Sequence, residues 1–597
     1  MSKLTDLIYP EDALHLPGLF NERVNRSSKK TAYQYFDNTT QQWLSHNWEQ
    51  VKNRIALIQH ALLNLNLNQG NCVGIMAHNC PEWMMFEQAA LGLGLVIVPL
   101  YPNDRADNIK YIVNDAEIKA LLIAGNEQCS VLENIRDDIK NIQKIISLQP
   151  VANNISDVIE FDTWIETENT PSYLIKKINP DQLASIVYTS GTTGRPKGVM
   201  LSHTNILQNA YGASQCESFL PSDVFLSFLP LSHMFERTVG YYLPMLAGST
   251  VVYARSIDKL GEDLINIKPT IFVTVPRIFE RVYNKIQLQL EDKPRISRIL
   301  FDLAVDVGWH WFRYSQNKSS WHFKLLIRPL LFKLISNKIL KKLGGNLRLA
   351  ISGGAALSPE IARTFIGLGL NISQGYGMTE ASPVVCTNLL HDNEPSSVGQ
   401  KLVNIDVRLG DDDELLVKGP SVMLGYLHNK EATSKIINNE GWLHTGDKAK
   451  IINEHIYITG RIKDILVLST GEKVPPNDIE LAITNDPLFE QAIVYGEGKP
   501  FLTAITALNP IEWEKLKDKL TVNKDIEIKS NEVNEYILAR LKKCLNDFPG
   551  YARIYKIYNT LDSWTVDNGL ATPTLKLKRK YIFEKYNQQI EDMYKGH

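Results

Sequence analysis

Residues 188–198 read Y-T-S-G-T-T-G-R-P-K-G and follow an apolar run, Leu183 to Val187, that is typical of a buried strand. A strand that ends in a loop rich in glycine and hydroxyls, with one lysine, predicts a phosphate-binding turn. The spacing differs from the Walker sequence G-x-x-x-x-G-K-[ST], and Pro196 stands where that loop would enter a helix. A polar surface turn is the plainer alternative, and eleven specified positions argue against it.

The loop carries three kinds of phosphate ligand. Backbone amides can approach a polyphosphate closely at its three glycines, Gly191, Gly194 and Gly198. Hydroxyl groups come from Thr189, Ser190, Thr192 and Thr193. Lys197 adds a positive charge. Together these groups predict a polyphosphate site.

Length and composition describe a globular protein of more than one domain. With 597 residues, the chain exceeds the size at which a single hydrophobic core keeps growing. Apolar residues make up 44% and charged residues 22%, which excludes a disordered chain. The formal net charge is −2, so no overall field attracts nucleic acid or anionic lipid, and any such attraction must be local.

The cysteines and the first residues indicate a cytoplasmic setting. Six scattered cysteines form no C-x-x-C pair, so we expect reduced thiols and no metal site built from them. The first 17 residues, M-S-K-L-T-D-L-I-Y-P-E-D-A-L-H-L-P, lack a basic region followed by an apolar core, unlike a secretion signal. No uncharged apolar stretch of about 18 residues occurs, so we expect no spanning helix. The sequence predicts a cytoplasmic protein, soluble or peripheral on the inner face of a membrane.

Short apolar runs alternate with helix-like segments through the first three quarters of the chain, which predicts α/β layers with mostly parallel sheets. The strand candidates are residues 72–76, 94–99, 120–124, 183–188, 224–228, 250–253, 270–275 and 347–351. The helix candidates between them include residues 48–65 and 81–93.

The pattern changes twice towards the C-terminus. From Asp406 to Gly460, shorter strands and polar turns predict a small β-barrel-like subdomain. After Arg461, two strands lie among helices, which predicts a separate α+β domain. The expected strands are 491–495 and 502–508, and the expected helices are 476–484 and 531–548. We therefore expect an N-terminal domain at residues 1–460 and a smaller, mobile C-terminal domain at 461–597, joined by a hinge.

Residues 295–342 stand out in composition. They hold ten Lys or Arg and two Asp, a local formal charge of +8, with tryptophan and phenylalanine interleaved. One interpretation is a helical hairpin whose apolar side packs on the core and whose basic side is solvated. The other is a membrane-surface patch, with aromatic side chains at the interface and basic side chains near anionic lipid.

Two motifs downstream suit an adenosine phosphate. The run S-G-G-A-A-L at 352–357 follows a strand, and its small residues, with Gly353 and Gly354 at the centre, could admit a flat purine. The run Q-G-Y-G-M-T-E at 374–380 holds Tyr376 between glycines, free to stack on a base. Thr379 offers a hydroxyl to a phosphate, and Glu380 offers a hard oxygen ligand to Mg²⁺ between phosphates.

Three more motifs complete an ordered set: G-W-L-H-T-G-D at 441–447, G-R-I-K-D at 460–464 and T-P-T-L-K-L-K-R at 572–579. The set resembles that of the AMP-forming adenylating enzymes, the family of acyl-CoA synthetases, luciferases and peptide-synthetase adenylation domains. The resemblance spans about residues 30 to 590 and is far more specific than any single motif.

The resemblance implies roles for these residues. The nucleotide site would include Thr189, Ser190, Gly191, Thr192, Thr193, Gly194, Lys197, Gly353, Gly354, Gln374, Gly375, Tyr376, Gly377, Thr379, Asp447, Arg461, Lys463 and Lys576. Within this set, Asp447 and Arg461 would hold the ribose and Lys463 would act as the hinge. Many relatives carry Asp at the hinge, whereas some acyl-CoA synthetases carry Lys. Magnesium would be bound by Thr189 and Glu380.

The resemblance also implies that the C-terminal domain supplies a catalytic lysine. Lys576 matches that lysine, and Lys578 is the alternative in the same basic run. The motif T-P-T-L-K resembles that of the long-chain fatty acyl-CoA synthetases in particular. In that family ATP and Mg²⁺ convert a carboxylate to an acyl-adenylate, and coenzyme A then displaces AMP.

Two further sequence motifs indicate which class of carboxylic acid is the substrate. L-P-L-S-H-M-F-E-R at 229–237 and V-P-R-I-F-E-R-V-Y at 275–283 resemble the long-chain branch, which assigns His233 and Arg277 to the substrate. His233 could equally be a structural side chain. Peptide-synthetase domains place Asp after the corresponding aromatic residue, whereas Glu236 follows Phe235 here, so an amino acid is disfavoured.

Two other functions remain open. A fatty acyl-AMP ligase would hand the acyl group to a carrier protein instead of coenzyme A. A lipid-binding scaffold would have lost catalysis altogether.

Overall fold

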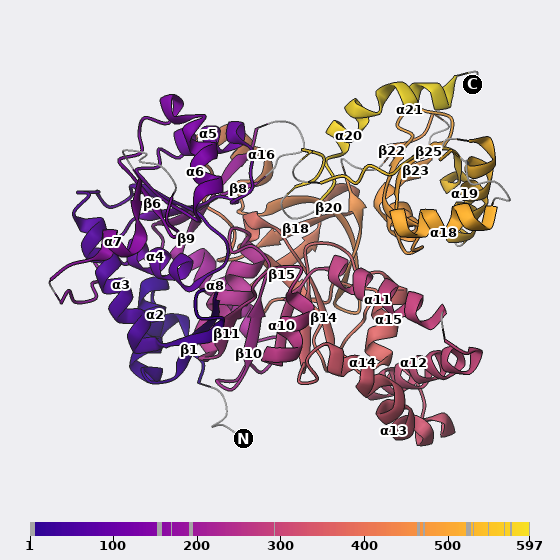
Figure 1. Cartoon of the computed structure of the whole chain (residues 1–597), viewed down its shortest axis with the longest axis horizontal. Coiled ribbons are helices and arrows are strands. Elements are labelled where there is room, and N and C mark those ends of the chain that lie inside the picture. The colour runs from indigo at the N-terminus through magenta and orange to yellow at the C-terminus, as the bar shows by residue number, and fades with distance from the viewer. Residues whose placement is uncertain are drawn as a thin grey trace.

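The structure is a computed structural model that describes residues 6–151, 158–168, 170–189, 195–291, 293–462, 466–469, 472–520, 527–528, 530–546, 548–565, 568–572 and 576–595. Two large sheets with helices form most of the chain, and a smaller C-terminal unit lies beside them (Figure 1). This arrangement confirms the predicted α/β class.

The sheet that carries the phosphate loop has eight strands in the order β19-β9-β8-β4-β3-β5-β6-β7. Their bounds are β3 Cys72–Met76, β4 Val96–Pro99, β5 Ala120–Ile123, β6 Lys144–Ser147, β7 Val158–Glu160, β8 Leu183–Thr189, β9 Lys197–Ser202 and β19 Gly425–Tyr426. Strands β3 to β8 pair in parallel, and β9 and β19 are antiparallel to their neighbours. Thr189 pairs with Lys197 across the β8–β9 hairpin, so the strands hold the loop between them at both ends.

The second sheet has nine strands in the order β16-β15-β14-β13-β12-β10-β11-β1-β2. Their bounds are β1 Thr31–Asp37, β2 Gln42–Asn47, β10 Val224–Ser227, β11 Thr250–Tyr253, β12 Ile271–Thr274, β13 Leu349–Ser352, β14 Ile372–Gly377, β15 Val384–Thr387 and β16 Gln400–Lys401. Strands β13 and β14 are parallel neighbours, so the motifs at their carboxyl ends meet at one edge of the sheet.

Helix α4 (Pro81–Gly92) packs between the two sheets and contacts β4 of one and β1 of the other. All but one of its residues are buried, as expected for a helix that is apolar on all sides. Its Glu87 carboxylate accepts hydrogen bonds from the Arg237 guanidinium, and both side chains are fully buried. Arg237 Nη1 also donates to Ser185 Oγ in β8 at 2.8 Å, so this ion pair ties together three elements of the core.

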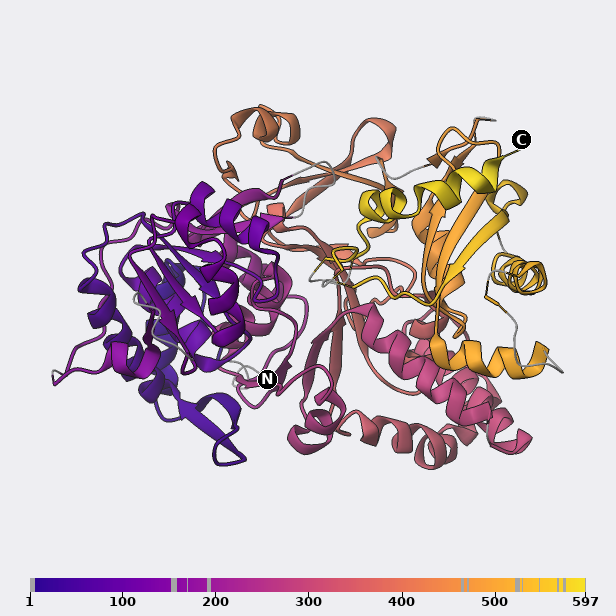
Figure 2. The ribbon, with the colours of Figure 1, turned by 45° about the horizontal axis from the view of Figure 1, so that its top comes forward.

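Four strands within residues 406–461 form the sheet β17-β18-β20-β21. Its strands are β17 Asp406–Leu409, β18 Glu414–Lys418, β20 Leu443–Ile452 and β21 His455–Arg461. The C-terminal unit follows, with a sheet of β24 (Phe489–Tyr495), β25 (Leu502–Leu508) and β26 (Ile554–Thr560) and a small pair, β22 (Leu466–Val467) and β23 (Lys473–Val474). Helices α17 (Pro476–Thr484), α18 (Pro510–Leu520), α19 (Asn531–Cys544), α20 (Arg579–Lys585) and α21 (Asn587–Tyr594) surround it (Figure 2). The predicted boundary between residues 460 and 461 stays a prediction.

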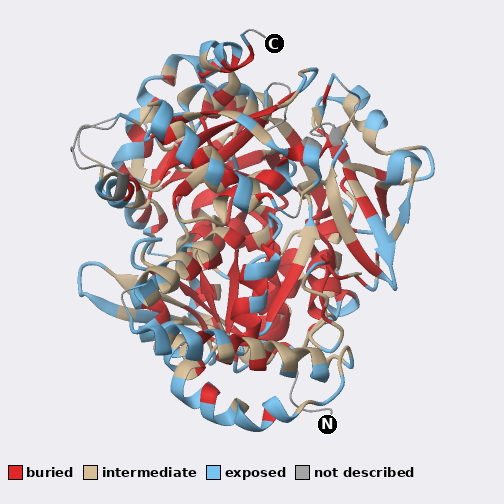
Figure 3. Cartoon of the chain, turned by 90° about the vertical axis from the view of Figure 1, so that its right-hand side faces the viewer, coloured by how far each residue is buried: buried red, intermediate tan, exposed pale blue. Residues whose placement is uncertain are grey.

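The basic and aromatic segment is helical and lies at the edge of the molecule, below the C-terminal unit in Figures 1 and 2. Its elements are α12 (Arg295–Ser315), η3 (Phe323–Ile327), α13 (Arg328–Leu331), η4 (Phe332–Ser336) and α14 (Asn337–Lys342). Buried residues concentrate in the central strands, whereas the peripheral helices are mainly exposed or intermediate (Figure 3). Within the described ranges, no helix combines the length and apolar composition needed to cross a bilayer.

Candidate active site

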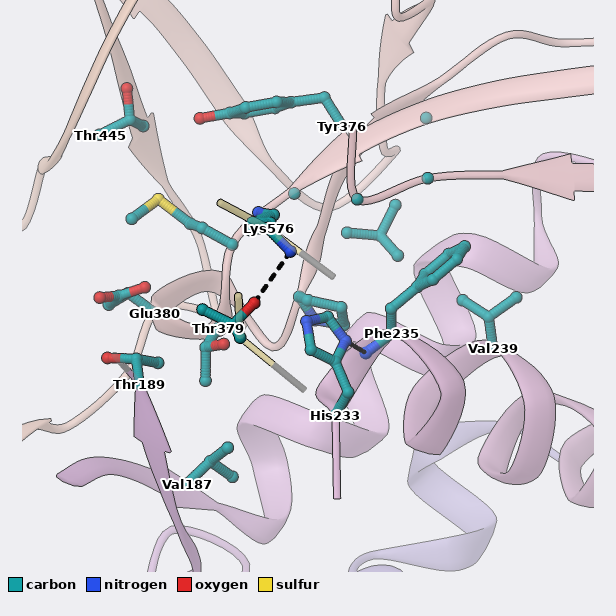
Figure 4. A pocket seen from close by; sticks show the side chains of 18 of the residues that line it. Val187, Thr189, His233, Phe235, Val239, Tyr376, Thr379, Glu380, Thr445 and Lys576 are labelled. Carbon is teal, nitrogen blue, oxygen red and sulfur yellow. Dashed lines mark hydrogen bonds between the residues drawn. The ribbon is translucent and has the colours of Figure 1, made fainter. Parts of the chain in front are cut away.

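A pocket with a volume of about 670 Å³ lies where the two large sheets, the four-stranded sheet and the C-terminal unit meet. Twelve residues predicted for the site line it: Thr189, Lys197, His233, Gly353, Gly354, Gly375, Tyr376, Gly377, Thr379, Glu380, Arg461 and Lys576. Figure 4 shows how residues separated by almost 400 positions in the sequence face the same space. Their assigned roles stay predictions, but their convergence is a fact of the fold.

The loop tip, Ser190 to Gly194, and the hinge residue Lys463 lie outside the described residues. The loop's two ends are described. Thr189 ends β8, and Lys197 starts β9 on the opposite side of the hairpin. Both of these end residues line the pocket.

The carboxylate of Glu380 is held by a tyrosine that the sequence analysis did not identify. Tyr426 donates its hydroxyl to Glu380 Oε1 at 2.8 Å. The ammonium of Lys197 lies over the Tyr426 ring, 4.9 Å from its centroid. Tyr426 therefore connects the phosphate loop with the expected metal ligand. The sequence did contain a hint of this role, because Gly425 and Tyr426 form the same Gly-Tyr pair as Gly375 and Tyr376.

The donor chemistry of this corner fits Mg²⁺. Glu380 and the Thr189 hydroxyl offer hard oxygen atoms on the same side of the pocket (Figure 4). Among the described residues, no group of three or more His, Cys, Asp or Glu side chains gathers as a metal cage. Mg²⁺ commonly binds through one or two protein oxygens together with substrate phosphates and water, so a sparse set suits it.

The expected ribose ligand, Asp447, is buried behind the pocket wall. Its Oδ1 accepts a hydrogen bond from Arg461 Nε at 3.0 Å, and its Oδ2 accepts one from the Tyr376 hydroxyl. Burial, with the neighbouring Asp447 charge, raises the pKa of Tyr376 well above its ordinary value, so this hydroxyl stays protonated and donates. Asp447 therefore positions two side chains that do line the pocket.

Glu414 was also missed by the sequence analysis. It lines the pocket and accepts hydrogen bonds from the backbone N–H of Gly446 at 2.8 Å and from His444. It stands at the end of a run of acidic residues, D-D-D-E, and nothing in that run distinguishes it from a solvated turn.

Gly353 shows why the second motif needs glycine. A Cβ atom there would lie 2.8 Å from the ring of Phe235, closer than side chains approach one another. The ring and the loop share one wall of the pocket, and a backbone without a side chain makes room for the aromatic ring. Gly354 has a positive φ of 82°, which a side chain would disfavour.

His233 lies next to Phe235, and its Nδ1 accepts a hydrogen bond from the Phe235 backbone N–H at 3.2 Å. Burial lowers the pKa of His233 to about 4, and the charge of Lys576 adds to the shift. The imidazole is therefore neutral at physiological pH, and it lines the pocket beside the apolar residues Phe235 and Val239 (Figure 4).

Lys576 reaches into the pocket from the C-terminal unit. Its backbone N–H donates to Thr572 Oγ1 at 3.0 Å, and its carbonyl accepts from the Thr572 N–H, so the backbone of Lys576 is held on Thr572. The side chain remains open to the space of the pocket, yet desolvation by the walls lowers its pKa. Arg461 lowers the pKa of Lys576 further, while Asp447 and Glu380 oppose the shift.

Lys578 also lines the pocket, but its charged neighbours are Asp104 and Arg105 of the first large sheet's loops. The two candidate lysines therefore face different surroundings. Lys576 stands among the residues predicted to bind the nucleotide, and Lys578 stands at the rim near residue 104.

Besides Asp447, two predicted site residues among those described lie outside the pocket lining. The Gln374 side chain is buried and receives the Leu357 backbone N–H at 3.0 Å, so it supports the loop after β13. Arg277 starts helix α11 (Pro276–Glu291) and donates from Nη2 to the Glu490 carbonyl of the C-terminal unit at 3.1 Å. Their predicted contacts with nucleotide and substrate stay predictions, and the structure gives each residue a different contact.

Comparisons with known proteins agree with this geometry. Residues 20–427 match the family of AMP-binding enzymes, and residues 463–597 match the AMP-binding enzyme C-terminal domain. The long-chain-fatty-acid–CoA ligase FadD15 of Mycobacterium bovis is 30% identical over 565 residues, which cover 92% of each chain. Long-chain-fatty-acid–CoA ligase 5 of Rattus norvegicus is 30% identical over 633 residues, covering 100% of this chain and 91% of that protein.

Solved structures share the fold at lower identity. The anthranilate CoA ligase AuaEII in complex with anthranoyl-AMP superposes with a TM-score of 0.75 at 20% identity, covering 98% of this chain and all of that one. ATP-bound MatB from Rhodopseudomonas palustris gives 0.70 at 21% identity, covering 97% and 100%. The fold, the pocket and the match over most of the sequence together place this chain in the AMP-binding enzyme family.

Proposed function

We propose that this chain is an AMP-forming long-chain-fatty-acid–CoA ligase. It couples a fatty acid to ATP, releasing pyrophosphate and leaving an acyl-adenylate, and the thiol of coenzyme A then displaces AMP to give acyl-CoA. The observation that carries this proposal is the pocket itself, which combines nucleotide-type residues and a lysine from the C-terminal unit with an extended apolar wall. The curated relatives with matching length carry the same activity in their names.

The apolar wall suits an alkyl chain. It consists of Val187, Ala213, Cys216, Phe219, Val239, Leu243, Leu349, Ile351 and Val384. Burying each methylene of an acyl chain there contributes about 0.8 kcal/mol. Glu236, which follows Phe235 in sequence, is fully buried and is not part of the pocket lining, so it is not placed to bind a substrate amine.

The first half-reaction brings an anionic carboxylate to an anionic α-phosphate, and the site must offset their repulsion. Lys576 and Lys197 supply positive charge, and Thr379 supplies a hydroxyl group. When bound by Glu380 and Thr189, Mg²⁺ would neutralise charge on the phosphates. His233 is neutral and adds no second positive charge beside Lys576. These groups act by position and charge, and no covalent attachment to a side chain is required.

The second half-reaction requires the thiol to reach the acyl-adenylate. We infer that the C-terminal unit rotates after adenylation, withdraws Lys576 and opens that side of the pocket to coenzyme A. Lys463 follows the last strand of the four-stranded sheet by two residues, and we propose it as the hinge.

We also propose that the protein works in the cytoplasm and takes its acid from a membrane surface. Long-chain acids partition into bilayers, because each buried methylene favours the lipid phase by about 0.8 kcal/mol. An enzyme for such acids gains substrate by working at that surface.

The test is an incubation with ATP, Mg²⁺, oleate and coenzyme A, followed by mass spectrometry of the products. We expect stoichiometric AMP and oleoyl-CoA, and a panel of chain lengths then defines the preferred acid. Acyl-adenylate that accumulates without thioester favours a fatty acyl-AMP ligase. Absence of acid-dependent AMP release with every chain length would leave the lipid-binding scaffold.

A further inference from the structure

The helical segment from Trp321 to Leu334 exposes a row of large apolar side chains, which we call the 321–334 face. Its members are Trp321, Phe323, Leu326, Ile327, Leu330, Phe332 and Leu334. Leu326 is 73% exposed, Phe323 67% and Leu330 60%. Single exposed leucines are ordinary, but a contiguous set of this size marks a surface that binds something.

The same segment is apolar on its opposite side. Leu325 and Leu331 are buried against Ala304 and Val307 of α12. A helical run that is apolar all round is normally covered on all sides. Here the protein covers one side, and the side chains of the 321–334 face stay exposed.

The charged residues of the chain segment that carries this face are all basic. From residue 307 to residue 359 the sequence contains no Asp or Glu. The same stretch contains Arg313, Lys318, Lys324, Arg328, Lys333, Lys338, Lys341, Lys342 and Arg348. Neighbouring acids neutralise part of this charge, since Lys318 lies 3.3 Å from Glu394 and Lys324 lies 3.6 Å from Asp306. Lys333, Lys338 and Lys341 are exposed and take no part in the ion pairs of the described residues.

Aromatic and basic side chains are also stacked on one another. The Arg328 guanidinium lies 4.7 Å from the centroid of the Trp311 ring and 5.9 Å from that of Phe332. Tryptophan, arginine and lysine side chains with apolar bodies and polar ends are suited to the boundary between water and lipid.

We propose that the 321–334 face docks this protein on an anionic lipid bilayer, with Phe323, Leu326 and Leu330 entering the interface and the lysines near lipid phosphates. This proposal rests on the proposed function, because it names the surface from which a long-chain acid would be taken. A second copy of the chain is a poorer occupant, since a symmetric contact would bring basic side chains against basic side chains. Lipid offers both an apolar interior and negative headgroups.

The chain connects this face directly to the pocket. Helix α14 ends at Lys342, and residues 343–348 lead into β13 (Leu349–Ser352). Leu349 and Ile351 of that strand belong to the apolar wall of the pocket. The docking surface and the acyl wall are therefore neighbouring parts of one chain segment.

The test is flotation of the full-length protein with vesicles, without ATP or fatty acid. We expect binding to vesicles of phosphatidylcholine with 30% phosphatidylglycerol, and at least about tenfold weaker binding to phosphatidylcholine alone. The triple variant Phe323→Ser/Leu326→Ser/Leu330→Ser should lose at least about tenfold in binding to the anionic vesicles. The matched control is Val403→Ser/Ile452→Ser/Ile511→Ser, three similarly exposed residues elsewhere, which should bind like the parent.

A second pair of variants tests the charges. Lys333→Glu/Lys338→Glu should weaken binding to anionic vesicles about tenfold or more, whereas Lys140→Glu/Lys450→Glu changes net charge equally at exposed sites elsewhere and should not. Equal binding by parent and triple variant, or equal binding to both lipids, overturns the proposal. So does a dimer in solution that the triple variant dissociates while vesicles bind neither form.

Activity in water separates this proposal from the proposed function. AMP release with decanoate, a soluble acid, should be the same for the parent and the triple variant, whereas release with oleate supplied in anionic vesicles should fall in the variant. Decanoate turnover without vesicle binding overturns only the docking proposal. Vesicle binding that depends on Phe323, Leu326 and Leu330, without turnover of any acid, overturns only the proposed ligase.

Discussion

The charge inside the pocket depends on single side chains, of which Lys576 is the clearest case. Lys576 stands where desolvation and Arg461 lower its pKa, while Glu380 and Asp447 favour its charged form. A lysine in these surroundings keeps a positive charge that can face two anions. We therefore expect Lys576 to contribute to the first half-reaction, when both anions are present.

Lys576→Ala should lower the rate of acyl-adenylate formation by roughly 10²–10³, the effect of losing one charge-stabilising donor. Thioester formation from supplied acyl-adenylate should be largely unchanged, because the C-terminal unit has then withdrawn this residue. Pyrophosphate release measures the first step, and mass spectrometry of acyl-CoA measures the second. Lys578→Ala is the control, and equal damage to both half-reactions by Lys576→Ala would show that the lysine is misassigned.

A second residue-level prediction concerns Glu236, which is fully buried. Neither of its carboxylate oxygens has a hydrogen-bond partner among the described residues. Burial raises its pKa to about 8. At neutral pH the folded protein holds it protonated, while the unfolded chain releases the proton above pH 4.5 or so. Glu236 therefore lowers the free energy of unfolding increasingly as pH rises from about 4.5 to 8. Above pH 8 this destabilisation is constant.

Glu236→Gln removes this dependence. At pH 7 the variant should be more stable by up to about 3 kcal/mol, and the advantage should shrink towards pH 5. Urea unfolding of both proteins at pH 5, 6, 7 and 8 gives the difference free of all other titrating groups. A difference that does not change with pH would mean that Glu236 is ionised in the folded state.

At the scale of elements, one contact joins α11 to the C-terminal unit. Arg277 Nη2 donates to the Glu490 carbonyl, and nearby Asn485 donates to Ser358 Oγ at 3.1 Å. Both bonds cross from the N-terminal part to the C-terminal unit while Lys576 occupies the pocket. We expect them to stabilise the arrangement in which Lys576 lies in the pocket, which we propose to be the adenylating one.

Arg277→Ala should therefore slow acyl-adenylate formation about tenfold, the weight of one hydrogen bond from a charged donor, without raising KM for the acid. The control is Arg281→Ala on the same helix, an exposed residue one turn further on. Pre-steady-state pyrophosphate release over a range of acid concentrations distinguishes a role of Arg277 in holding the C-terminal unit from a role in binding the acid. A higher KM with unchanged kcat would instead support the predicted substrate contact.

The bounds of many helices and strands could be predicted from the sequence. Residues 250–253, 476–484 and 502–508 have the predicted bounds, because alternation or helical periodicity and flanking turn residues define them locally. Strand 94–99 begins two residues late, at Val96, and helix 531–548 ends early, at Cys544. End positions depend on pairing and capping, which the periodicity does not specify.

The site was predictable where a motif follows a strand. Parallel strands bring such motifs to one edge, so Gly353, Tyr376 and Glu380 meet as expected. Arg277 was assigned to the substrate, although α11 directs it to the C-terminal unit. Tyr426 was missed because its strand of two residues acquires its place only by pairing with β9. Neither placement follows from local sequence.

At the scale of the whole molecule, a buried ion pair joins helix α4, which packs between the two large sheets, to the helical segment Glu236–Tyr242 and to β8 of the eight-stranded sheet. Glu87 and Arg237 are both without solvent exposure, and Arg237 also reaches Ser185 in β8. Phe235 and Val239, which stand before and after Arg237 in the chain, line the pocket, so the buried pair lies directly behind its wall. The pair gains little net stability by itself, but breaking it leaves an uncompensated charge in the core.

Arg237→Ala should destabilise the protein by about 3–5 kcal/mol, because the Glu87 carboxylate loses its partner. The double variant Glu87→Gln/Arg237→Met removes both charges and should recover most of that loss. Urea unfolding followed by circular dichroism measures all three proteins. A double variant no more stable than Arg237→Ala would show that packing around these side chains, and not their charge, holds the sheets together.

The contact of Gly353 with Phe235 limits how this enzyme can diverge. A Cβ atom at residue 353 would overlap the aromatic ring, which belongs to a separate segment of the chain. A descendant could carry a larger residue in place of Gly353 only if Phe235 had been replaced by a smaller residue earlier or at the same time. We therefore expect descendants of this gene to change the two codons as a pair, and expect mutational scans to find the replacement at 353 tolerated only in backgrounds with a smaller residue at 235.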